Sequence, residues 1–182
     1  MNYRKWVELG NPLDDTTMGP RNNEDTATKV DRHIKDALEK GAKVLYGGKR
    51  AKSFPTNLYY EPTVIDNISE DMLLNAEETF GPVTAIMTFL EHDESIEISN
   101  RSILGLQSAL FTSSLKKAFY FAERIETGNV VVNDSSVYWE AHTTFGGCGG
   151  KRSGYGRLGG KNTIIEMTDL KTIVIDLENV RK

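Results

Sequence analysis

The sequence predicts an α/β fold, a layered parallel or mixed sheet with flanking helices. Short apolar runs of strand length alternate with amphipathic segments of helix length along most of the chain. The connections between them are short, which favours right-handed crossovers between neighbouring strands. The 182 residues are 38% apolar and 26% charged, as expected of one globular domain or of one domain with a small appendage.

Helices are predicted where apolar side chains recur every three or four residues. The longest runs from Asn22 to Lys40, where Asn22 or Asn23 can cap the first turn and Gly41 can end the last. The apolar stripe expected on this helix is Val30, Ile34, Ala37 and Leu38. A helical turn is expected after Ser69 or Asp71, and further helices over 93–101, 113–127 and 162–167.

Strands are predicted over 43–46, 59–66, 83–89, 108–112, 129–133 and 171–177. The 83–89 and 129–133 runs carry no charge, so both are expected to be buried. Pro62 has no N–H to donate, which favours an edge position for the 59–66 strand. The 171–177 strand has no sequence neighbour to pair with, and we expect it at a sheet edge or on a second subunit.

Composition excludes several classes of function. The net charge of -4 disfavours nucleic acid as a partner, because phosphate binding needs a basic face. No apolar run approaches the ~18 residues of a membrane span, and the N-terminus does not resemble a signal peptide. The single cysteine, Cys148, allows no internal disulfide, so a reducing cytoplasm is expected. The three histidines are scattered without metal-ligand spacing, and no metal site is predicted.

A candidate site lies where two carboxylates and an aromatic ring precede a Gly-Pro break. Glu77, Glu78 and Phe80 come immediately before Gly81-Pro82, at the start of the 83–89 strand. A loop at the end of a strand is a common place for function on an α/β scaffold. The alternative is a pair of solvated carboxylates at a helix end beside a core phenylalanine.

Two further motifs do not predict a functional site. Residues 154–159 match the dinucleotide fingerprint G-x-G-x-x-G, but no buried strand precedes them, so a sharp glycine turn is expected instead. Cys148 stands among glycines, where a thiol could react, but nothing in the sequence places a base beside it. Both lie in a long irregular region, 134–161, of a kind that is usually functional or poorly ordered.

Together these blocks resemble the aldehyde dehydrogenase superfamily, and the resemblance covers nearly the whole chain. The strongest are Glu77-Glu78-Thr79-Phe80-Gly81-Pro82-Val83, Phe145-Gly146-Gly147 and Ser153-Gly154-Tyr155-Gly156-Arg157. They are similar to the C-terminal part of such an enzyme. The resemblance implies a partial catalytic domain over residues 1–168 and an oligomerisation strand with a tail over 169–182.

The resemblance also implies roles for individual residues. Glu78 matches the glutamate that accepts hydrogen bonds from the nicotinamide ribose of NAD or NADP, and Phe80 matches an aromatic beside the nicotinamide. Trp139 and Phe145 match aromatic positions that line the substrate tunnel. No catalytic residue is implied, because the family's nucleophilic cysteine, base glutamate and cofactor domain all precede the block that corresponds to Met1.

The chain is therefore expected to be a C-terminal fragment of an NAD(P)-dependent aldehyde dehydrogenase that is inactive alone and binds cofactor poorly by itself. Its expected partners are a second copy, through 171–177, or the missing N-terminal half. The alternative is a non-enzymatic, self-associating or partner-binding module derived from the family. Two departures from the family pattern could loosen the loop that closes the site: five residues rather than three separate the last two blocks, and Thr144 replaces a proline.

Overall fold

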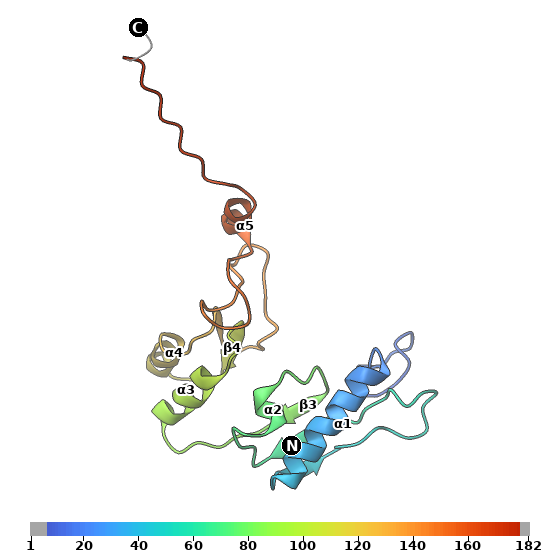
Figure 1. Cartoon of the computed structure of the whole chain (residues 1–182). Coiled ribbons are helices and arrows are strands. Elements are labelled where there is room, and N and C mark those ends of the chain that lie inside the picture. Colours follow the sequence, from blue (N-terminus) through green and yellow to red (C-terminus); the bar gives the residue numbers. More distant parts are fainter. Residues whose placement is uncertain (1–6, 179–182) are drawn as a thin grey trace. The chain divides into compact units, whose positions relative to one another are not determined.

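A computed structural model describes residues 7–178. The chain divides into two compact units, with the boundary between Glu91 and His92 (Figure 1). Each unit combines helices with a small sheet, which confirms the predicted α/β class. None of the helices in the described range is both long enough and apolar enough to cross a membrane.

The first unit is built on a three-stranded mixed sheet. Its strands are β1 (Lys43–Tyr46), β2 (Thr63–Asp66) and β3 (Val83–Ala85), in the order β1-β2-β3. The β1 and β2 strands are antiparallel, whereas β2 and β3 are parallel, with Val64 opposite Thr84. Helix α1 (Glu24–Glu39) lies beside the segment that carries the short helix α2 (Leu73–Ala76) (Figure 1).

Helix α1 forms where the sequence predicts it, and for the predicted reasons. The Asn23 side chain accepts the backbone N–H of Thr26 at 2.9 Å, and Gly41 follows the helix in the left-handed conformation. The predicted apolar stripe is wrong at Leu38, whose side chain is exposed. His33 is buried instead, because it lies on the face that packs against the core and the 77–79 segment.

The core of the first unit lies between α1 and β2. Val30, Ile34 and Ala37 of α1 are buried together with Ile65 of β2 and Met72. At ~25 cal/mol per Å2 of apolar surface removed from water, this cluster is the main stabilising contribution to the unit. It therefore fixes α1 against the strand that precedes the 77–83 segment.

Two strand predictions in this unit need correction. The 59–66 strand is shorter, and β2 is the central strand rather than an edge; Pro62 stands just before it, where its missing N–H costs no ladder hydrogen bond. The 83–89 strand ends at Ala85 and is not buried on both faces. Thr84 and Ala85 are exposed because β3 is the outer strand of this sheet.

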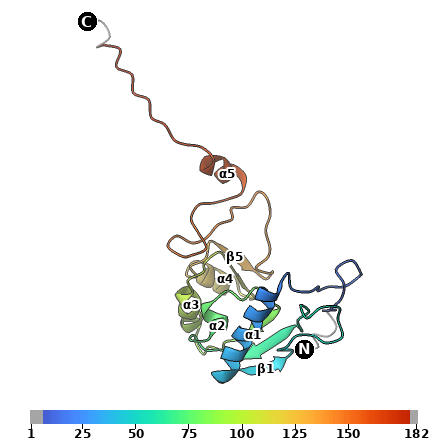
Figure 2. The same ribbon diagram turned by 45° about the vertical axis from the view of Figure 1, so that its right-hand side comes forward.

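The second unit contains a two-stranded parallel sheet with helices beside it (Figure 2). In chain order the elements are α3 (His92–Arg101), β4 (Gln107–Leu110), α4 (Leu115–Ala122), β5 (Asn129–Val132) and α5 (Gly160–Glu166). Ser114 caps α4 by accepting the N–H of Lys117 at 3.3 Å. The β4-α4-β5 order is a strand-helix-strand unit, as the alternating pattern predicts.

Three predictions in the second unit are wrong in part. Helix α4 is shorter than 113–127, with Ala118 as its buried side chain. The β5 strand is partly exposed rather than buried, because it pairs only with β4 among the described strands. Residues 171–177 form no strand and are exposed, since no strand of the described chain lies beside them; their pairing with a second subunit stays a prediction.

Candidate functional site

Helix α1 holds the segment that carries the Glu-Glu-x-Phe motif, here called the 77–83 loop. One guanidinium nitrogen of Arg32 donates to Oε2 of Glu77 at 2.6 Å, and Nε2 of His33 lies 3.2 Å from the same oxygen. Lys29 donates from Nζ to the backbone carbonyl of Glu78. Glu77 therefore serves to attach the loop to α1, and its carboxylate is not simply solvated at a helix end.

His33 forms a second contact with the loop. Its Nδ1 lies 3.0 Å from the hydroxyl of Thr79, and its side chain is fully buried. Burial lowers the pKa of His33 below its ordinary value, although the nearby Glu77 opposes that shift. The hydrogen bond from His33, aided by the Arg32 charge, lowers the pKa of Glu77. At neutral pH the pair is thus a neutral imidazole and a carboxylate.

Helix α1 also contacts the chain before and after the Glu77–Thr79 segment. Oδ2 of Asp36 accepts the backbone N–H of Leu73 at 2.8 Å, which holds the first turn of α2. At the other end, a Cβ atom on Gly81 would meet Cγ2 of Val30 at 2.5 Å. Only glycine allows the backbone to approach the buried Val30 side chain this closely.

Within this frame Glu78 and Phe80 are left accessible. The Glu78 side chain is exposed and has no hydrogen-bond or ion-pair partner among the residues that the structure describes. Phe80 is 68% exposed and takes a left-handed backbone conformation, with φ +50°. The alternative of a core phenylalanine is therefore wrong. An exposed carboxylate on an anchored loop can accept hydrogen bonds from two hydroxyl groups.

In the second unit Phe145 is held by a short backbone ladder. Its N–H donates to the carbonyl of Leu158 at 2.8 Å, and the N–H of Leu158 donates back at 2.7 Å. The backbone of the next residue, Gly146, packs closely against Gly128. A Cβ atom on Gly128 would lie 1.6 Å from the carbonyl oxygen of Gly146. Phe145 is consequently partly buried at a defined position.

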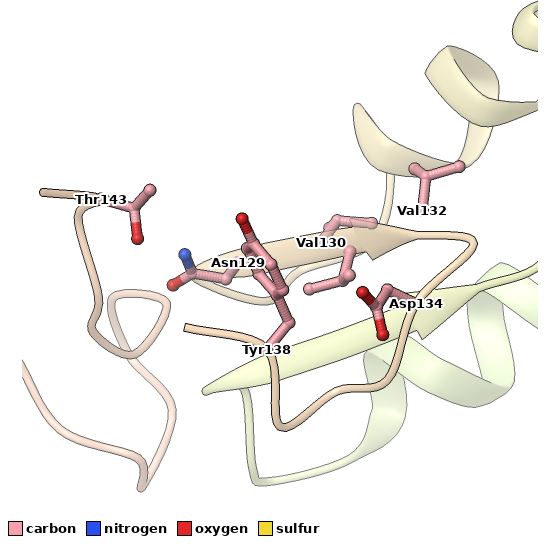
Figure 3. Close-up of a pocket in the computed structure, with 7 residues that line it drawn as sticks. Asn129, Val130, Val132, Asp134, Tyr138 and Thr143 are labelled. Carbon is pink, nitrogen blue, oxygen red and sulfur yellow. The ribbon is translucent and has the colours of Figure 1, made fainter. Parts of the chain in front are cut away.

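Trp139 lies on the loop after β5, with 52% of its surface exposed. A pocket of about 350 Å3 lies beside β5 (Figure 3). Figure 3 shows Asn129, Val130 and Val132 along the strand, with Asp134 and Tyr138 on the following loop. Neither Trp139 nor Phe145 is among the lining residues, so within the described chain the two aromatics do not share this pocket.

Cys148 lies in a turn that backbone hydrogen bonds hold in place. Its backbone N–H donates to the carbonyl of Gly105 at 2.8 Å. Nδ1 of His142 is 3.2 Å from a carboxylate oxygen of Glu140, so this histidine is engaged elsewhere. The lengthened segment between the two motif blocks, 148–152, is held in place as well, since the backbone N–H of Arg152 donates to the carbonyl of Ile103 at 2.8 Å. Across residues 7–178, no cluster of His, Cys, Asp and Glu side chains could hold a metal ion.

Comparison with known proteins identifies the family. The family model described as "Aldehyde dehydrogenase family" matches residues 2–173. The chain belongs to the aldehyde dehydrogenase family. It is 42% identical over 170 residues to 3-sulfolactaldehyde dehydrogenase of Priestia aryabhattai, a match that spans 93% of this chain and 34% of that protein. It is 41% identical to lactaldehyde dehydrogenase of Methanocaldococcus jannaschii over 176 residues, or 96% and 36% of the two chains.

Solved aldehyde dehydrogenases have the same fold. The enzyme from Mycobacterium tuberculosis complexed with NAD+ superposes with a TM-score of 0.88 at 29% identity, over 97% of this chain and 36% of its own. Aldehyde dehydrogenase 21 from Physcomitrella patens, in complex with succinate, gives a TM-score of 0.84 at 34% identity, over 97% and 35%. The chain thus spans about a third of the length of the aldehyde dehydrogenases it matches.

The structure adds residues that the sequence interpretation missed. Lys29, Arg32, His33 and Asp36 all contact the 71–79 segment, and Lys40 extends the same contacts to the carbonyl of Asp71. Their spacing of three or four residues places them on one side of α1. The signal in the sequence that could have indicated these residues is a stripe of polar side chains beside the apolar stripe of α1.

Proposed function

We propose that this chain supplies the nicotinamide-ribose contact and part of the substrate wall of an NAD(P)-dependent aldehyde dehydrogenase that oxidises an aldehyde to a carboxylate. The observation that carries the proposal is the exposed, unpaired Glu78 carboxylate next to Phe80, on a loop that α1 anchors. An anchored carboxylate can orient a ribose without rearranging, which is how positioning contributes to rate.

When bound, NAD(P) supplies the hydride acceptor. In this arrangement Glu78 accepts hydrogen bonds from the ribose hydroxyls, and Phe80 offers an apolar face to the nicotinamide. Phe145 and Trp139 line the substrate side and keep water away from it. The only cysteine, Cys148, lies in a hydrogen-bonded turn, and among residues 7–178 its thiol has no hydrogen-bond partner that would activate it, so we expect no aldehyde oxidation by the chain alone.

Complementation tests this proposal. The chain is co-expressed with Methanocaldococcus jannaschii lactaldehyde dehydrogenase from which the region matched by this chain has been removed. NAD(P)H formation from lactaldehyde is expected from the pair and from neither part alone. Glu78→Gln in the pair is expected to raise KM for NAD(P)+ about tenfold, since one charge-assisted hydrogen bond is weakened. The control is Glu39→Gln, an exposed glutamate at the end of α1.

Two outcomes of that experiment contradict the proposal. One is an active pair in which Glu78→Gln and Glu39→Gln have the same KM for NAD(P)+. The other is NAD(P)H formation by this chain on its own. An unchanged KM would remove Glu78 from the cofactor site, whereas activity of the chain alone would show that it carries its own nucleophile.

A second candidate function is a self-associating module derived from the family. It is favoured by the apolar side chains after α5. Leu170, Ile173, Val174, Ile175 and Leu177 are each more than 70% exposed in the single chain. A segment with this much exposed apolar surface is stabilised when a second copy pairs with it as a strand.

A further inference from the structure

We propose that His33 is a positioning residue for the cofactor loop, because its buried imidazole bridges the two residues on either side of Glu78 and so sets the place of the Glu78 carboxylate. Nε2 reaches the Glu77 carboxylate at 3.2 Å and Nδ1 reaches the Thr79 hydroxyl at 3.0 Å. The inference rests on the proposed role of Glu78. The hydrogen bonds of His33 and the order of the 77–83 loop can nevertheless be measured in the chain without cofactor.

The partners of the ring determine which nitrogen carries the proton. Nε2 lies 3.2 Å from the Glu77 carboxylate, which can only accept, and 3.4 Å from a guanidinium nitrogen of Arg32, which can only donate. The Glu77 contact is the shorter of the two, so we assign the proton to Nε2. Nδ1 of the neutral ring is then the acceptor, and Thr79 donates its hydroxyl proton to it. A contact with a carboxylate on one side and a hydroxyl on the other fixes the ring plane as well as its tautomer.

The imidazole of His33 is neutral, although charged side chains surround it. Lys29, Arg32 and Asp36 of α1 and Glu77 of the loop are the charged groups that act on His33. Arg32 donates to the same Glu77 oxygen at 2.6 Å, so it neutralises the carboxylate that His33 faces. His33 contributes orientation here, and Arg32 contributes charge.

Glu78 gains its position through its neighbours, since its own side chain has no partner among residues 7–178. The chain on either side of Glu78 is fixed at Glu77 and at Thr79, and its carbonyl accepts from Lys29. With the peptide units before and after it held, the Glu78 side chain retains only its own rotamers. Without the His33 imidazole, Thr79 loses its contact with α1, and the backbone of Thr79 and Phe80 becomes more mobile.

The test uses NMR spectroscopy of the full chain without any nucleotide. Long-range 1H–15N spectra are expected to show the His33 ring protonated at Nε2 and bare at Nδ1. Order parameters of the Glu78 and Phe80 amides are expected near about 0.85 in the parent chain and below about 0.6 in His33→Phe. Thr79→Val is expected to loosen the same amides, and Thr79→Ser, which keeps the hydroxyl, is expected to restore them.

His142→Gln replaces an exposed histidine in the other unit and is expected to leave both amides rigid. If His33→Phe does not fold, the Thr79→Val and Thr79→Ser pair decides the question. A ring protonated at Nδ1, or amides that stay rigid in Thr79→Val, would overturn the positioning role. Failure of the complementation experiment would leave these NMR results unaffected, so the two proposals fail separately.

Discussion

Oδ2 of Asp36 accepts the backbone N–H of Leu73 at 2.8 Å, which joins the last turn of α1 to the first residue of α2. The same carboxylate pairs with Lys40 at 2.9 Å. These contacts, with those of Arg32 and His33, make α1 the support of the whole 71–79 segment. The 77–83 loop is therefore positioned by residues of a helix that lie more than forty residues earlier in the sequence.

The first unit is expected to lose stability in two steps as the pH falls. The pKa of His33 is lowered in the folded state, so the unfolded chain binds its proton first, and stability decreases as the pH falls below the ordinary value of 6.5. The lowered pKa values of Glu77 and Asp36 act in the same direction below about 4.5 and 3.8. Urea unfolding of the first unit, followed at several pH values, measures both steps.

His33→Gln isolates the first step. This variant is expected to show a flat urea midpoint between about pH 7.5 and pH 5.5, where the parent chain declines. His142→Gln serves as the control and should follow the parent. A parent chain that becomes more stable as the pH falls through this window would be inconsistent with a buried neutral imidazole.

Gly128→Ala is expected to disrupt the segment that carries Phe145. The added methyl group would lie 1.6 Å from the carbonyl oxygen of Gly146, a backbone atom that cannot move aside alone. We expect a loss of about 3 kcal/mol in the free energy of unfolding of the second unit. Gly149→Ala has no atom within 4 Å of the new methyl and is expected to change stability by less than about 0.5 kcal/mol. Equal effects of the two variants would show that the close approach is not present.

Tyr60→Phe is expected to destabilise the first unit by about 1 kcal/mol, because the buried hydroxyl donates to Oδ1 of Asp31 at 3.0 Å. Burial, aided by Asp31, raises the pKa of Tyr60. The parent should therefore lose stability as the pH rises through the ordinary tyrosine value of 10.0, and Tyr60→Phe should lose less. Tyr46→Phe, at a partly buried tyrosine of β1, is the control; alkaline unfolding identical in parent and Tyr60→Phe would refute the assignment.

Ile175→Asp is expected to weaken self-association through the segment after α5. The side chain is 72% exposed in the single chain, and a charge there opposes strand pairing across an apolar contact. Light scattering coupled to size exclusion should show the parent above the monomer mass and the variant at it. Leu13→Asp, at a residue 91% exposed in the first unit, should leave the parent mass unchanged. A strictly monomeric parent would count against an assembly role.

Much of the fold could be predicted because local signals determine it. Asn23, Gly41 and the apolar stripe of α1 act within one helix, and each is visible in the sequence. Burial of β3 and β5 was mispredicted because an uncharged run indicates a strand but not how many neighbours it has. In the described chain β5 pairs only with β4, so its side chains stay partly exposed.

The candidate site was predictable only at the residues that carry a motif. Glu78 and Phe80 stand in a recognisable block, whereas His33 and Arg32 act across more than forty residues of sequence. Leu38 was assigned to the buried stripe of α1 and is exposed, whereas His33 was not assigned to it and is buried. A buried histidine is stable there because the loop supplies hydrogen-bond partners that the helix sequence does not reveal.

The most direct measurement mixes the purified chain with an aldehyde and NAD(P)+ and follows NAD(P)H absorbance. We expect no NAD(P)H at any pH, because the thiol of Cys148 has no hydrogen-bond partner among residues 7–178 that would activate it as a nucleophile. NAD(P)H formation that disappears in Cys148→Ala would contradict this, since it would show that the Cys148 thiol acts as a nucleophile.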